Sequence, residues 1–563
     1  MFKYDWLLSY LDTDTRKISH IVNDKKAMEE MYNKYRAQIW VGYNSRNYDQ
    51  WILKAILCDF NPWVMNDWII NKERKGFEFS RLLAKFPVLN YDASVGFRSL
   101  KELEAFMGHD IRETSVPFDI DRKLTTKEID ATFGYCDTDV MELFHVFVET
   151  KDEFESHMGL IKEFKLPITN VSKTKAQISA IILDAVRKDR YDEFDIVFPN
   201  TAQLGKYAWL MDWYQEWAQT KTYDSMELKT NVAGVPHTFG IGGLHGSVDN
   251  YVGEGTFIMA DVGSYYPALM IEYDFLSRNV KNKAFFKVIR DERIEMKKVK
   301  NPKEKPRKIV LNSTYGASKD QYNALYDPLQ ANNVCIAGQL LLVDLIDKLE
   351  GKCQLIQSNT DGILVKLYRD ADKDMIISIC EEWGKRVRMT MEYDVYKKVI
   401  QKDVNNYIIV PEGDLYDKKG YPRWKAKGAF VKKLSPLDNN LPIVNKAVVD
   451  YFIKGIPVER TIMSAKNLID FQFITKISGK YEYGVHGNNI VRGKVHRVFA
   501  SALSKDETLY KLKKDTGRLE KTGGTPINCF IDNGDVQNKP ITSRLDRQWY
   551  INLATERIQS FLG

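Results

Sequence analysis

Cysteine is scarce in this 563-residue chain, and its six residues are scattered along the sequence. No Cys-x-x-Cys pair occurs, so neither a zinc ribbon nor a disulfide framework is indicated. A reducing, cytoplasmic environment is therefore the default expectation for this protein.

Long apolar runs are also missing from the sequence. No uninterrupted run approaches the ~18 residues of a membrane span. The opening residues, MFKYDWLLSYLDTD, lack the basic and apolar segments of a signal peptide. Low-complexity tracts and internal repeats are absent as well. We therefore expect no association with a membrane.

Charge of one sign is in only small excess, with 82 Lys and Arg against 76 Asp and Glu and a formal net charge of +6. Mild basicity is compatible with a nucleic-acid partner but does not establish one. The length and the 44% hydrophobic content predict about three or four domains with several cores.

The stretch from Gly255 to Met270 places a lone carboxylate between two apolar runs. Phe257–Ala260 has the length of a strand, and Asp261 follows it directly. A carboxylate at the end of a buried strand is costly without a compensating positive charge. A divalent metal is the usual partner when a second carboxylate is near. Taken alone, Asp261 is more often a helix cap or a turn residue, so the metal hypothesis needs a second acid.

That second acid lies about one hundred residues downstream, between Cys353 and Leu367. Two strand-like apolar runs flank the polar turn Ser358–Gly362, and its Asp-Gly pair is a strong hairpin signal. Asp361 is therefore expected at the tip of a hairpin. As a turn residue it needs no function, but as the partner of Asp261 it completes a two-carboxylate site.

Basic residues fall on two predicted helices between these acids. The first helix carries Arg293 and Lys297 one turn apart. After a proline-containing turn, a second helix is predicted to begin at Lys308, with Asn312 and Tyr315 on the same face. Two helices joined in this way run antiparallel. The pattern indicates either a solvated charged surface or a site that presents three cations together.

Residues 1 to about 155 alternate strand and helix signals, as expected of an α/β domain. A short buried strand leads to Asn44 and Asp49 at the start of a helix. A later helix carries Tyr135 and Asp139 on one face, because they are four residues apart. The two aspartates are either a helix cap and a solvated residue, or two metal ligands with Tyr135 placing a water. Spacing alone favours the first interpretation.

Two further stretches are candidates for contact with a phosphate backbone. The glycine-rich GIGG run lets the chain approach phosphates closely, although a plain flexible turn explains it equally well. Residues 396–433 alternate strand-like segments with basic residues, as on a surface that follows phosphates. The candidate residues in the two stretches are Gly242, Gly243, Lys402, Tyr407, Lys427 and Gly428.

In this order, these pieces resemble the motifs of the family B DNA polymerases, and particularly of short, phage-encoded members. The family's D-x-x-S-L-Y-P motif is similar to Asp261–Pro267, its K-x3-N-S-x-Y-G motif to Lys308–Gly316, and its Y-G-D-T-D-S motif to Ser358–Gly362. Upstream, Asn44–Asp49 and Tyr135–Asp139 resemble the second and third motifs of the family's proofreading exonuclease. Each motif alone is weak, but five in the family's order are strong together.

The resemblance implies template-directed DNA synthesis by phosphoryl transfer with two Mg²⁺ ions, for which Mn²⁺ can substitute. It implies that Asp261, Asp361 and the carbonyl of Val262 bind these ions. It implies nucleotide binding by Ser264, Tyr265, Tyr266, Arg293, Lys297, Lys308, Asn312 and Tyr315. It implies that Asn359 and Thr360 support the metal-binding turn. It also implies DNA contact by Gly242, Gly243, Lys402, Tyr407, Lys427 and Gly428.

Three departures from the family's pattern modify these expectations. Asn359 replaces the first acid of the hairpin motif, which the family needs less, so polymerisation should survive. Asp5-Trp6-Leu7 does not supply the D-x-E motif of the first exonuclease strand, and the chain begins where that strand should already be under way. We therefore expect weak or no 3′→5′ exonuclease activity, either because proofreading is lacking or because the true start lies upstream. Third, the close spacing of the polymerase motifs leaves no room for the long insertions of protein-primed relatives, so ordinary primer extension is expected.

The implied fold is multidomain, with α/β and α+β parts: an RNase H-like exonuclease domain followed by a right-hand polymerase with palm, fingers and thumb. The implied partners are primer–template DNA, dNTPs and phage replication proteins, and the chain is expected to be a monomer in the host cytoplasm. The expected segments are 1–155 (exonuclease-like), 156–245 (helical connector and start of the palm), 246–280 and 318–433 (palm), 281–317 (fingers hairpin) and 434–563 (thumb).

Three other functions stay open on the sequence. The chain could be an active 3′→5′ exonuclease whose polymerase half only holds DNA, or a non-catalytic DNA-binding platform. It could also be a nucleotidyltransferase that makes RNA or works without a template. The pair Asp261 and Asp361, together with the missing exonuclease acids, argues against the nuclease, and Tyr266 argues against ribonucleotides.

Overall fold

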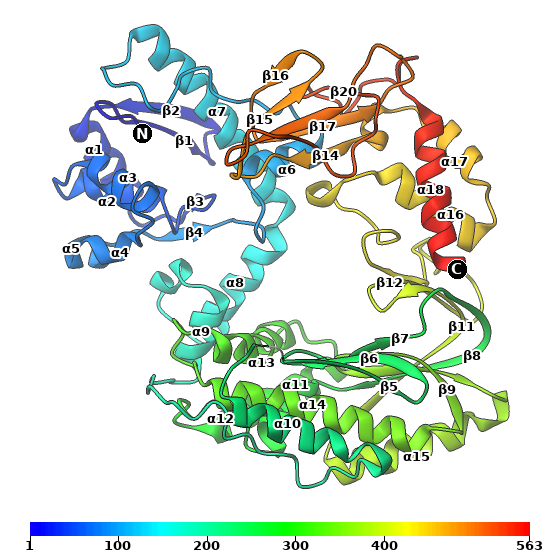
Figure 1. The fold of residues 1–563 in the computed structure, drawn as a ribbon. Helices are drawn as coiled ribbons and strands as arrows, with labels where there is room; N and C mark the ends of the chain where they lie inside the picture. Colours follow the sequence, from blue (N-terminus) through cyan, green and yellow to red (C-terminus); the bar gives the residue numbers. More distant parts are fainter. Residues whose placement is uncertain (225) are drawn as a thin grey trace. The chain divides into compact units, whose positions relative to one another are not determined.

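The computed structural model describes residues 1–224 and 226–563, which form two compact units. Each unit contains both helices and strands (Figure 1), in agreement with the expected mixed, multidomain architecture. The finer arrangement into an RNase H-like domain, palm, fingers and thumb, with its six segments, stays a prediction. The first unit comprises Met1–Lys173, Leu434–Asp450 and Ile456–Leu553, and the second comprises Thr174–Lys433, Tyr451–Gly455 and Ala554–Gly563.

The second unit is built on a nine-stranded sheet whose paired neighbours all run antiparallel. Its order is β13-β12-β11-β8-β10-β9-β7-β6-β5, so the strand that contains the apolar run before Asp261 lies in the interior of the sheet. The strands are β5 (Glu227–Val232), β6 (Val235–Gly240), β7 (His245–Ser247), β8 (Tyr251–Val262), β9 (Cys353–Asn359), β10 (Gly362–Leu367), β11 (Met391–Asp403), β12 (Asn406–Pro411) and β13 (Lys425–Lys427).

Helices of this unit lie along one side of the sheet, where α10, α11, α14 and α15 are seen together in Figure 1. The predicted basic helix and its successor are α12 and α13, which pack against each other. The helices are α9 (Lys175–Ile182), α10 (Trp209–Thr220), α11 (Tyr265–Glu272), α12 (Lys283–Lys298), α13 (Glu304–Lys319), α14 (Pro328–Leu349) and α15 (Lys373–Val387).

Helix α13 begins at Glu304, four residues before the predicted start at Lys308. The sequence predicts that the breaker Asn301-Pro302, with Pro306 just beyond it, precedes the helix, but Pro306 falls in the first turn of α13. Because the first N–H groups of a helix have no partner inside it, a proline there costs no hydrogen bond. The helix that carries Lys308, Asn312 and Tyr315 on one face is therefore longer than predicted.

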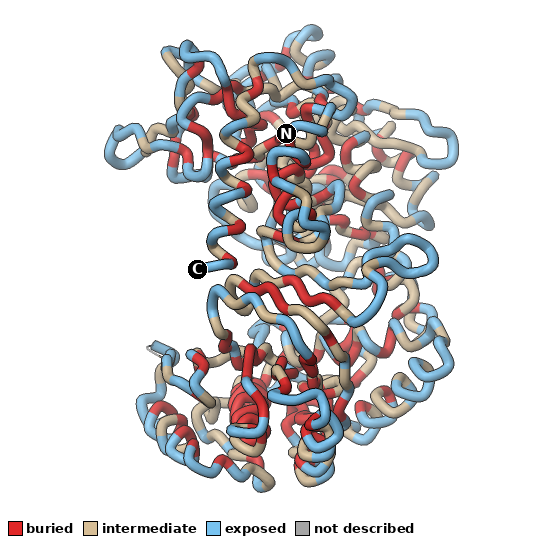
Figure 2. The backbone as a smooth tube through the Cα atoms, turned by 90° about the vertical axis from the view of Figure 1, so that its right-hand side faces the viewer, coloured by how far each residue is buried: buried red, intermediate tan, exposed pale blue. Residues whose placement is uncertain are grey.

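Helix α14 is the core helix of the second unit, with nearly all of its residues buried; Figure 2 colours the whole backbone by burial. By length and composition it could cross a membrane, a feature missed in the sequence, but 94% of the apolar window is buried inside the protein. Its buried polar side chains are paired, as burial requires. Asp344 accepts from Arg386 at 2.6 Å, and the Gln339 amide donates to two backbone carbonyls.

The amino-terminal part of the first unit has two separate pairs of strands. β1 and β2 pair antiparallel, whereas β3 and β4 pair parallel. The first strand begins only at Leu7, so the expectation that the chain opens inside a strand is wrong. The elements are β1 (Leu7–Asp12), β2 (Lys17–Val22), α1 (Lys25–Tyr35), β3 (Trp40–Gly42), α2 (Asp49–Leu57), α3 (Pro62–Ile70), α4 (Gly76–Phe79), α5 (Arg81–Lys85), β4 (Asn90–Asp92), α6 (Leu100–Met107), α7 (Thr126–Glu149) and α8 (Lys151–Glu163).

The carboxy-terminal residues, the segment expected to form the thumb, contribute mostly strands to this unit. They form two small antiparallel sheets, β14-β17-β20 and β16-β15-β18-β19. The elements are α16 (Pro442–Lys454), α17 (Val458–Ser464), β14 (Phe473–Lys476), β15 (Tyr481–His486), β16 (Asn489–Val491), β17 (Val495–Ala500), β18 (Leu509–Lys513), β19 (Leu519–Lys521), β20 (Cys529–Ile531) and α18 (Arg547–Leu562).

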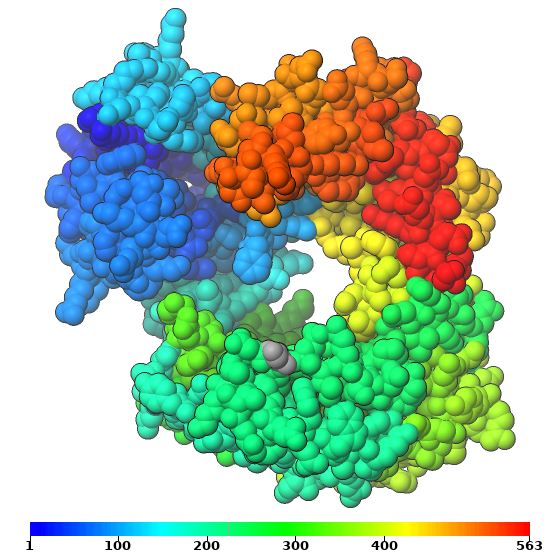
Figure 3. Space-filling view, in the orientation of Figure 1, coloured from blue at the N-terminus to red at the C-terminus, as the bar shows by residue number. Residues whose placement is uncertain are grey.

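Helix α6 joins the early and late parts of the first unit, whose cyan and orange surfaces meet in Figure 3. Its apolar side chains share one core with β14 and β17. The fully buried Arg497 donates to the carbonyls of Ala105 at 3.0 Å and His109 at 2.8 Å. These bonds satisfy a buried cation without a carboxylate, and burial lowers its pKa to about 10.

Candidate active site

Asp261 lies at the end of β8, between β10 and β11. In the antiparallel register it is opposite Gly362 of β10 and opposite Glu392 of β11. Asp261 is half-buried, while Phe257 and Ile258 before it are fully buried. At this position, therefore, an apolar strand ends on a carboxylate.

Asp361 lies in the turn between β9 and β10, where the hairpin pattern predicts it. Its carbonyl accepts a 2.7 Å hydrogen bond from the N–H of Val262, which fastens the turn beside Asp261. Its own N–H donates to the carbonyl of Asn359 at 2.6 Å. Thr360 has a left-handed backbone, with φ of 53°, and among the described residues it is the one β-branched residue in that region. Strain of this kind is concentrated at functional sites.

Gly362 shows how closely the Asp261 carboxylate approaches β10. A Cβ atom at this position would lie 1.9 Å from Oδ1 of Asp261 and 2.9 Å from the carbonyl oxygen of Ala260. Only glycine leaves room for the Asp261 carboxylate here. The Asp-Gly pair is thus a spatial requirement of the site as well as a turn signal.

Negative charge accumulates around these two acids. Burial raises the pKa of Asp261 to about 6, and the nearby carboxylates of Asp361 and Asp394 act in the same direction. The side chain of Asp361 is exposed, but partial desolvation by the surrounding protein raises its pKa against the lowering effect of Lys427. Crowded carboxylates with incomplete balancing charge form a favourable environment for a divalent cation.

The raised pKa of Asp261 predicts that the metal-free protein is more stable when this group is uncharged. A carboxyl whose pKa is higher in the folded protein than in the unfolded chain opposes folding above both values, and the penalty disappears on acidification from about 6 to about 4. We expect Asp261→Asn to raise the free energy of unfolding at pH 7 by about 1–3 kcal/mol, measured by urea unfolding in EDTA. The exposed Glu382→Gln is the control, and an unchanged or lower stability of Asp261→Asn would contradict this account.

The donor atoms at this place fit Mg²⁺. The side chains of Asp261 and Asp361 and the carbonyl of Val262 are all oxygen donors, the type that Mg²⁺ prefers. Their juxtaposition across β8 and the β9–β10 turn, and the raised pKa values of both acids, support the fit. Asn359 stands where a further acid would add charge.

The two helices α12 and α13 carry the predicted cations. Nη1 of Arg293 donates to Oγ of Ser264 at 2.6 Å, at the start of α11. Nζ of Lys297 lies 2.9 Å from Oε1 of Glu392. Lys308 is exposed and has no ion pair with any residue of the described ranges. Arg293 and Lys297 therefore reach the ends of β8 and β11, and Lys308 offers an uncompensated charge.

The aromatic residues predicted to bind nucleotide fall into two groups. Tyr265 is buried, and its hydroxyl donates to the carbonyl of Gly338 at 2.7 Å, so its side chain anchors α11 to α14. Tyr266 and Tyr315 are half-buried, with ring centroids 4.4 Å apart. Asn312 is exposed on α13. The ring pair and Asn312 remain the candidates for direct nucleotide contact.

The glycine-rich run supports the acidic turn, a role that the sequence did not reveal. A Cβ atom on Gly243 would lie 2.3 Å from Oγ1 of Thr360, and the carbonyl of Leu244 accepts from the N–H of Thr360 at 2.8 Å. The carbonyl of Gly242 accepts from the Gln339 amide at 2.8 Å, which fixes the run on α14. The DNA contact predicted for these glycines stays a prediction.

The other predicted DNA-contact residues lie on β11–β13 and just after. Lys402 is paired with Asp403 at 2.6 Å, which offsets its charge. Tyr407 and Lys427 are opposite each other in β12 and β13, with Nζ 5.8 Å from the ring centroid. Gly428 has φ of 99°, and a Cβ there would lie 2.0 Å from a carbonyl oxygen. The backbone conformation at position 428 therefore requires glycine, whether or not DNA binds.

His237 is a supporting residue that sequence reasoning missed. It is buried on β6; its Nδ1 donates to the Val235 carbonyl at 2.8 Å, and its Nε2 accepts from Oγ of Ser358 at 2.7 Å. Burial lowers its pKa to about 4, so the ring is neutral near pH 7. It connects β6 with the strand that leads to Asp361. The alternation of buried Val235, His237 and Phe239 could have identified it.

The exonuclease-like acids are near each other, but one of them is already paired with a cation. Asp49 is exposed at the start of α2, where desolvation by the surrounding protein raises its pKa and the neighbouring carboxylates of Asp92 and Asp139 act in the same direction. Nζ of Lys101 lies 2.6 Å from Oδ1 of Asp139 and 4.7 Å from the centroid of the Tyr135 ring. A lysine thus neutralises the carboxylate that the sequence proposes as a metal ligand.

Asn44 helps to fix the turn that precedes Asp49. Its φ is 56°, and its N–H donates to Oδ1 of Asp92 at 3.0 Å and to Oγ of Ser94 at 2.8 Å. Asp92 is a further carboxylate near Asp49 that sequence reasoning missed. Because Asp92 also accepts from the N–H of Arg46 at 3.0 Å, its oxygens are engaged by the backbone of this turn.

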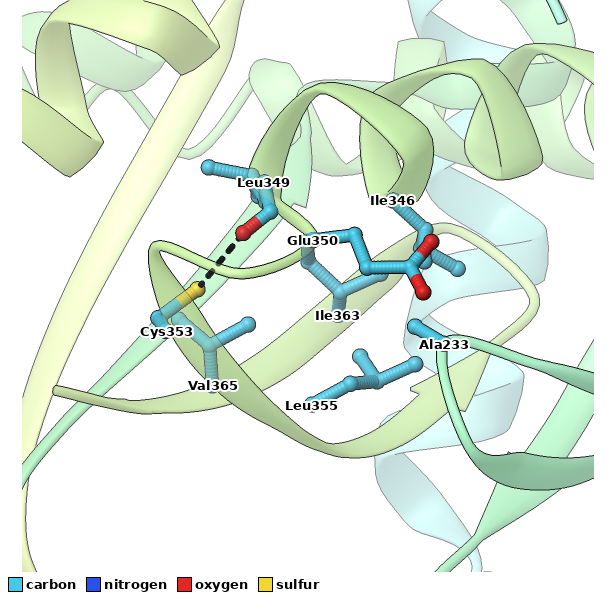
Figure 4. A pocket seen from close by; sticks show the side chains of 8 residues that line it. All are labelled: Ala233, Ile346, Leu349, Glu350, Cys353, Leu355, Ile363 and Val365. Carbon is cyan, nitrogen blue, oxygen red and sulfur yellow. Dashed lines mark hydrogen bonds between the residues drawn. The ribbon is translucent and has the colours of Figure 1, made fainter. Parts of the chain in front are cut away.

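A small pocket lies between the end of α14 and the strands β9 and β10 (Figure 4). It has room for about one water molecule, so it is too small for a nucleotide. The thiol of Cys353 donates to the Leu349 carbonyl at its edge. Its lining is mostly aliphatic and belongs to the core: Ala233, Ile346, Leu349, Glu350, Cys353, Leu355, Ile363 and Val365.

Comparison with known proteins gives distant likenesses among solved structures only. No family model and no curated protein matches the chain. Among solved structures, it is similar to the family B DNA polymerase from the hyperthermophilic archaeon Pyrobaculum calidifontis, with 13% identity and a TM-score of 0.42. The match covers 99% of this chain and 74% of that one. A likeness of this strength concerns the course of the chain alone, and the chemistry of the site rests on its own side chains.

Proposed function

We propose that this protein is a template-directed DNA polymerase that extends a primer with dNTPs by phosphoryl transfer. The observation that carries the proposal is the register of β8 and β10, which sets Asp261 opposite Gly362, with Asp361 immediately before it. This register brings together two carboxylate residues that are one hundred residues apart in the sequence. Primer extension with dNTPs, with and without a template, tests the proposal.

In this proposal Asp261, Asp361 and the carbonyl of Val262 hold two Mg²⁺ ions. When bound, such ions supply charge neutralisation at the attacking 3′-hydroxyl and at the triphosphate. The chain's own contribution is to orient the donors. The Val262–Asp361 hydrogen bond and the support of the turn by the glycine-rich run hold the two acids in register.

The basic side chains of α12 and α13 would bind the triphosphate. Phosphoryl transfer depends on positioning and charge neutralisation, which Arg293, Lys297 and Lys308 can provide. Tyr266 would lie under the sugar and exclude a 2′-hydroxyl, while Asn312 and Tyr315 would line the nascent base pair. The hydrogen bond from Arg293 to Ser264, which follows Asp261 by three residues in the chain, supports this role for the guanidinium.

Arg293→Ala should therefore weaken nucleotide use without unfolding the protein. We expect kcat/KM for dNTP to fall by about 100-fold, because a charge-assisted contact to phosphate is lost. Steady-state primer extension at varied dNTP concentration measures it. Lys298→Ala on the same helix is the matched control, since Lys298 is exposed and, within the described part of the chain, pairs with Glu295. Equal losses in both variants would contradict a specific role for Arg293.

We further propose that 3′→5′ exonuclease activity is weak or missing. The Lys101–Asp139 ion pair and the backbone bonds of Asp92 leave few oxygens to bind a metal. A 5′-labelled single strand incubated with Mg²⁺ or Mn²⁺ should be shortened no faster by the wild-type chain than by Asp139→Asn. Rapid shortening that Asp139→Asn abolishes would show an active exonuclease. A role in phage genome replication, with phage partner proteins, remains a prediction from the sequence.

A further inference from the structure

We propose that His109, Glu142 and His145 form a binding site for a transition-metal ion, with Zn²⁺ as the preferred occupant. The three residues lie in the first unit, whereas the residues to which the polymerase proposal gives a role belong to the second unit. His109 follows the end of α6, and the other two lie on α7. The inference does not depend on the proposed polymerase function.

The geometry of the three side chains is close to that of a metal site. Glu142 and His145 are three residues apart on α7, so both project from one face of the helix. One ligand atom from each of the three residues lies within 4.8 Å of the others. Tetrahedral ligands with bonds of ~2.0 Å are about 3.3 Å apart. Binding of an ion would therefore draw the ligand atoms together by up to about 1.5 Å.

The contacts within the cluster leave one nitrogen without a partner. Nδ1 of His109 lies 2.6 Å from Oε2 of Glu142, which is an ordinary hydrogen bond. Nδ1 of His145, however, lies 3.7 Å from Oε1 of Glu142, which is too long for a hydrogen bond. This nitrogen is a buried atom with no hydrogen-bond partner among the described residues. An ion shared by Glu142 and His145 would satisfy it.

The ligand types indicate which ion would bind. Imidazole nitrogen suits zinc and related transition metals, whereas Mg²⁺ prefers an all-oxygen site. Glu142 is buried, and the His109 side chain is 16% exposed, so two of the ligands are shielded from water. The His145 side chain is 42% exposed, which gives the ion an entry path. Two histidines and one glutamate leave a fourth position for water.

The position of the cluster suggests a structural role for the ion. His109 lies where the chain leaves α6, and its carbonyl accepts from the buried Arg497. Glu142 and His145 lie on α7, one turn beyond Asp139. A bound ion would therefore fasten the end of α6 to α7 beside the core that β14 and β17 share with α6.

The experiment titrates Zn²⁺ into the full chain by calorimetry, in the presence of excess Mg²⁺. The chain carries Asp261→Asn and Asp361→Asn, so that these acids cannot contribute a second site. We expect one Zn²⁺ to bind per chain. Adding His145→Ala should weaken binding by at least about 100-fold, since loss of a direct ligand exceeds the usual effect of losing its supporting partner. His20→Ala, a half-exposed histidine that contacts Asp137 of α7, should leave binding unchanged.

Cobalt(II) provides an independent signature of the ligands. The parent chain should give the visible absorption of Co²⁺ in a low-symmetry nitrogen and oxygen site, and His145→Ala should lose it. Circular dichroism shows whether each variant is folded, and the exposure of His145 makes its alanine variant suitable. Absence of Zn²⁺ binding to the parent chain, or equal affinity in folded His145→Ala, would overturn the proposal.

Discussion

Asp361→Asn should reduce template-directed primer extension by at least about 10³-fold, because one of the two acids proposed to bind metal is lost and several kcal/mol of charge stabilisation would disappear with it. The substitution keeps the size of the side chain, and the turn is held through the Asp361 backbone, so the fold should persist. Incorporation of labelled dNTP on a primed template measures the loss. Binding of the same DNA, followed by fluorescence anisotropy, should change little.

Two comparisons make the Asp361 result specific. Asp394→Asn removes an acid that is near Asp261 but paired with Lys425 at 2.8 Å, and it should retain most of the activity. Asp361→Glu should restore little, since one additional methylene moves the carboxylate within a site of fixed spacing. Primer extension by Asp361→Asn at a rate near that of the wild type would refute the role proposed for this acid.

Gly362→Ala should be nearly as damaging, although it removes no functional group. Its methyl group would lie 1.9 Å from Oδ1 of Asp261, so the carboxylate or the hairpin must move. The nearby carbonyl of Ala260 belongs to an interior strand and cannot move away easily. We expect primer extension to fall by at least about 100-fold and the free energy of unfolding by about 1–3 kcal/mol. Single-turnover incorporation and urea unfolding measure the two effects.

Gly134→Ala is the matched control for this substitution. Gly134 is exposed within α7, and a Cβ there meets no atom within 4 Å. Alanine should leave the activity unchanged and raise stability by up to about 1 kcal/mol, because glycine is a poor helix former. If Gly362→Ala behaved like Gly134→Ala, the close approach of Asp261 to β10 would be wrong.

Local sequence patterns predicted the elements that carry the candidate site. The Asp-Gly pair and its apolar flanks indicated the β9–β10 hairpin, and the apolar run before Asp261 indicated β8. The basic helix was also expected, as α12. These features depend on neighbours within a few residues, so they are visible in the sequence. The start of α13 was misplaced because a proline is harmless in the first turn.

The pairing between distant strands could not be derived from local patterns. Strand register depends on contacts between segments that are far apart in sequence, and a shift by one residue reverses every side chain. The position of Asp261 opposite Gly362 belongs to this class. The contact of Gly243 with Thr360 and the ion pair of Lys101 with Asp139 also depend on segments that are far apart in sequence. The late strands were missed because they are short and interrupted by turns.

Template-dependent primer extension by the unmodified chain tests the central claim most directly. A labelled primer is supplied with Mg²⁺ and with dNTPs or NTPs, in the presence and absence of a template. The account predicts incorporation of dNTPs only, in the order that the template specifies, and none after chelation of the metal. Failure to extend the primer under these conditions, by a folded protein that binds the DNA, would contradict it.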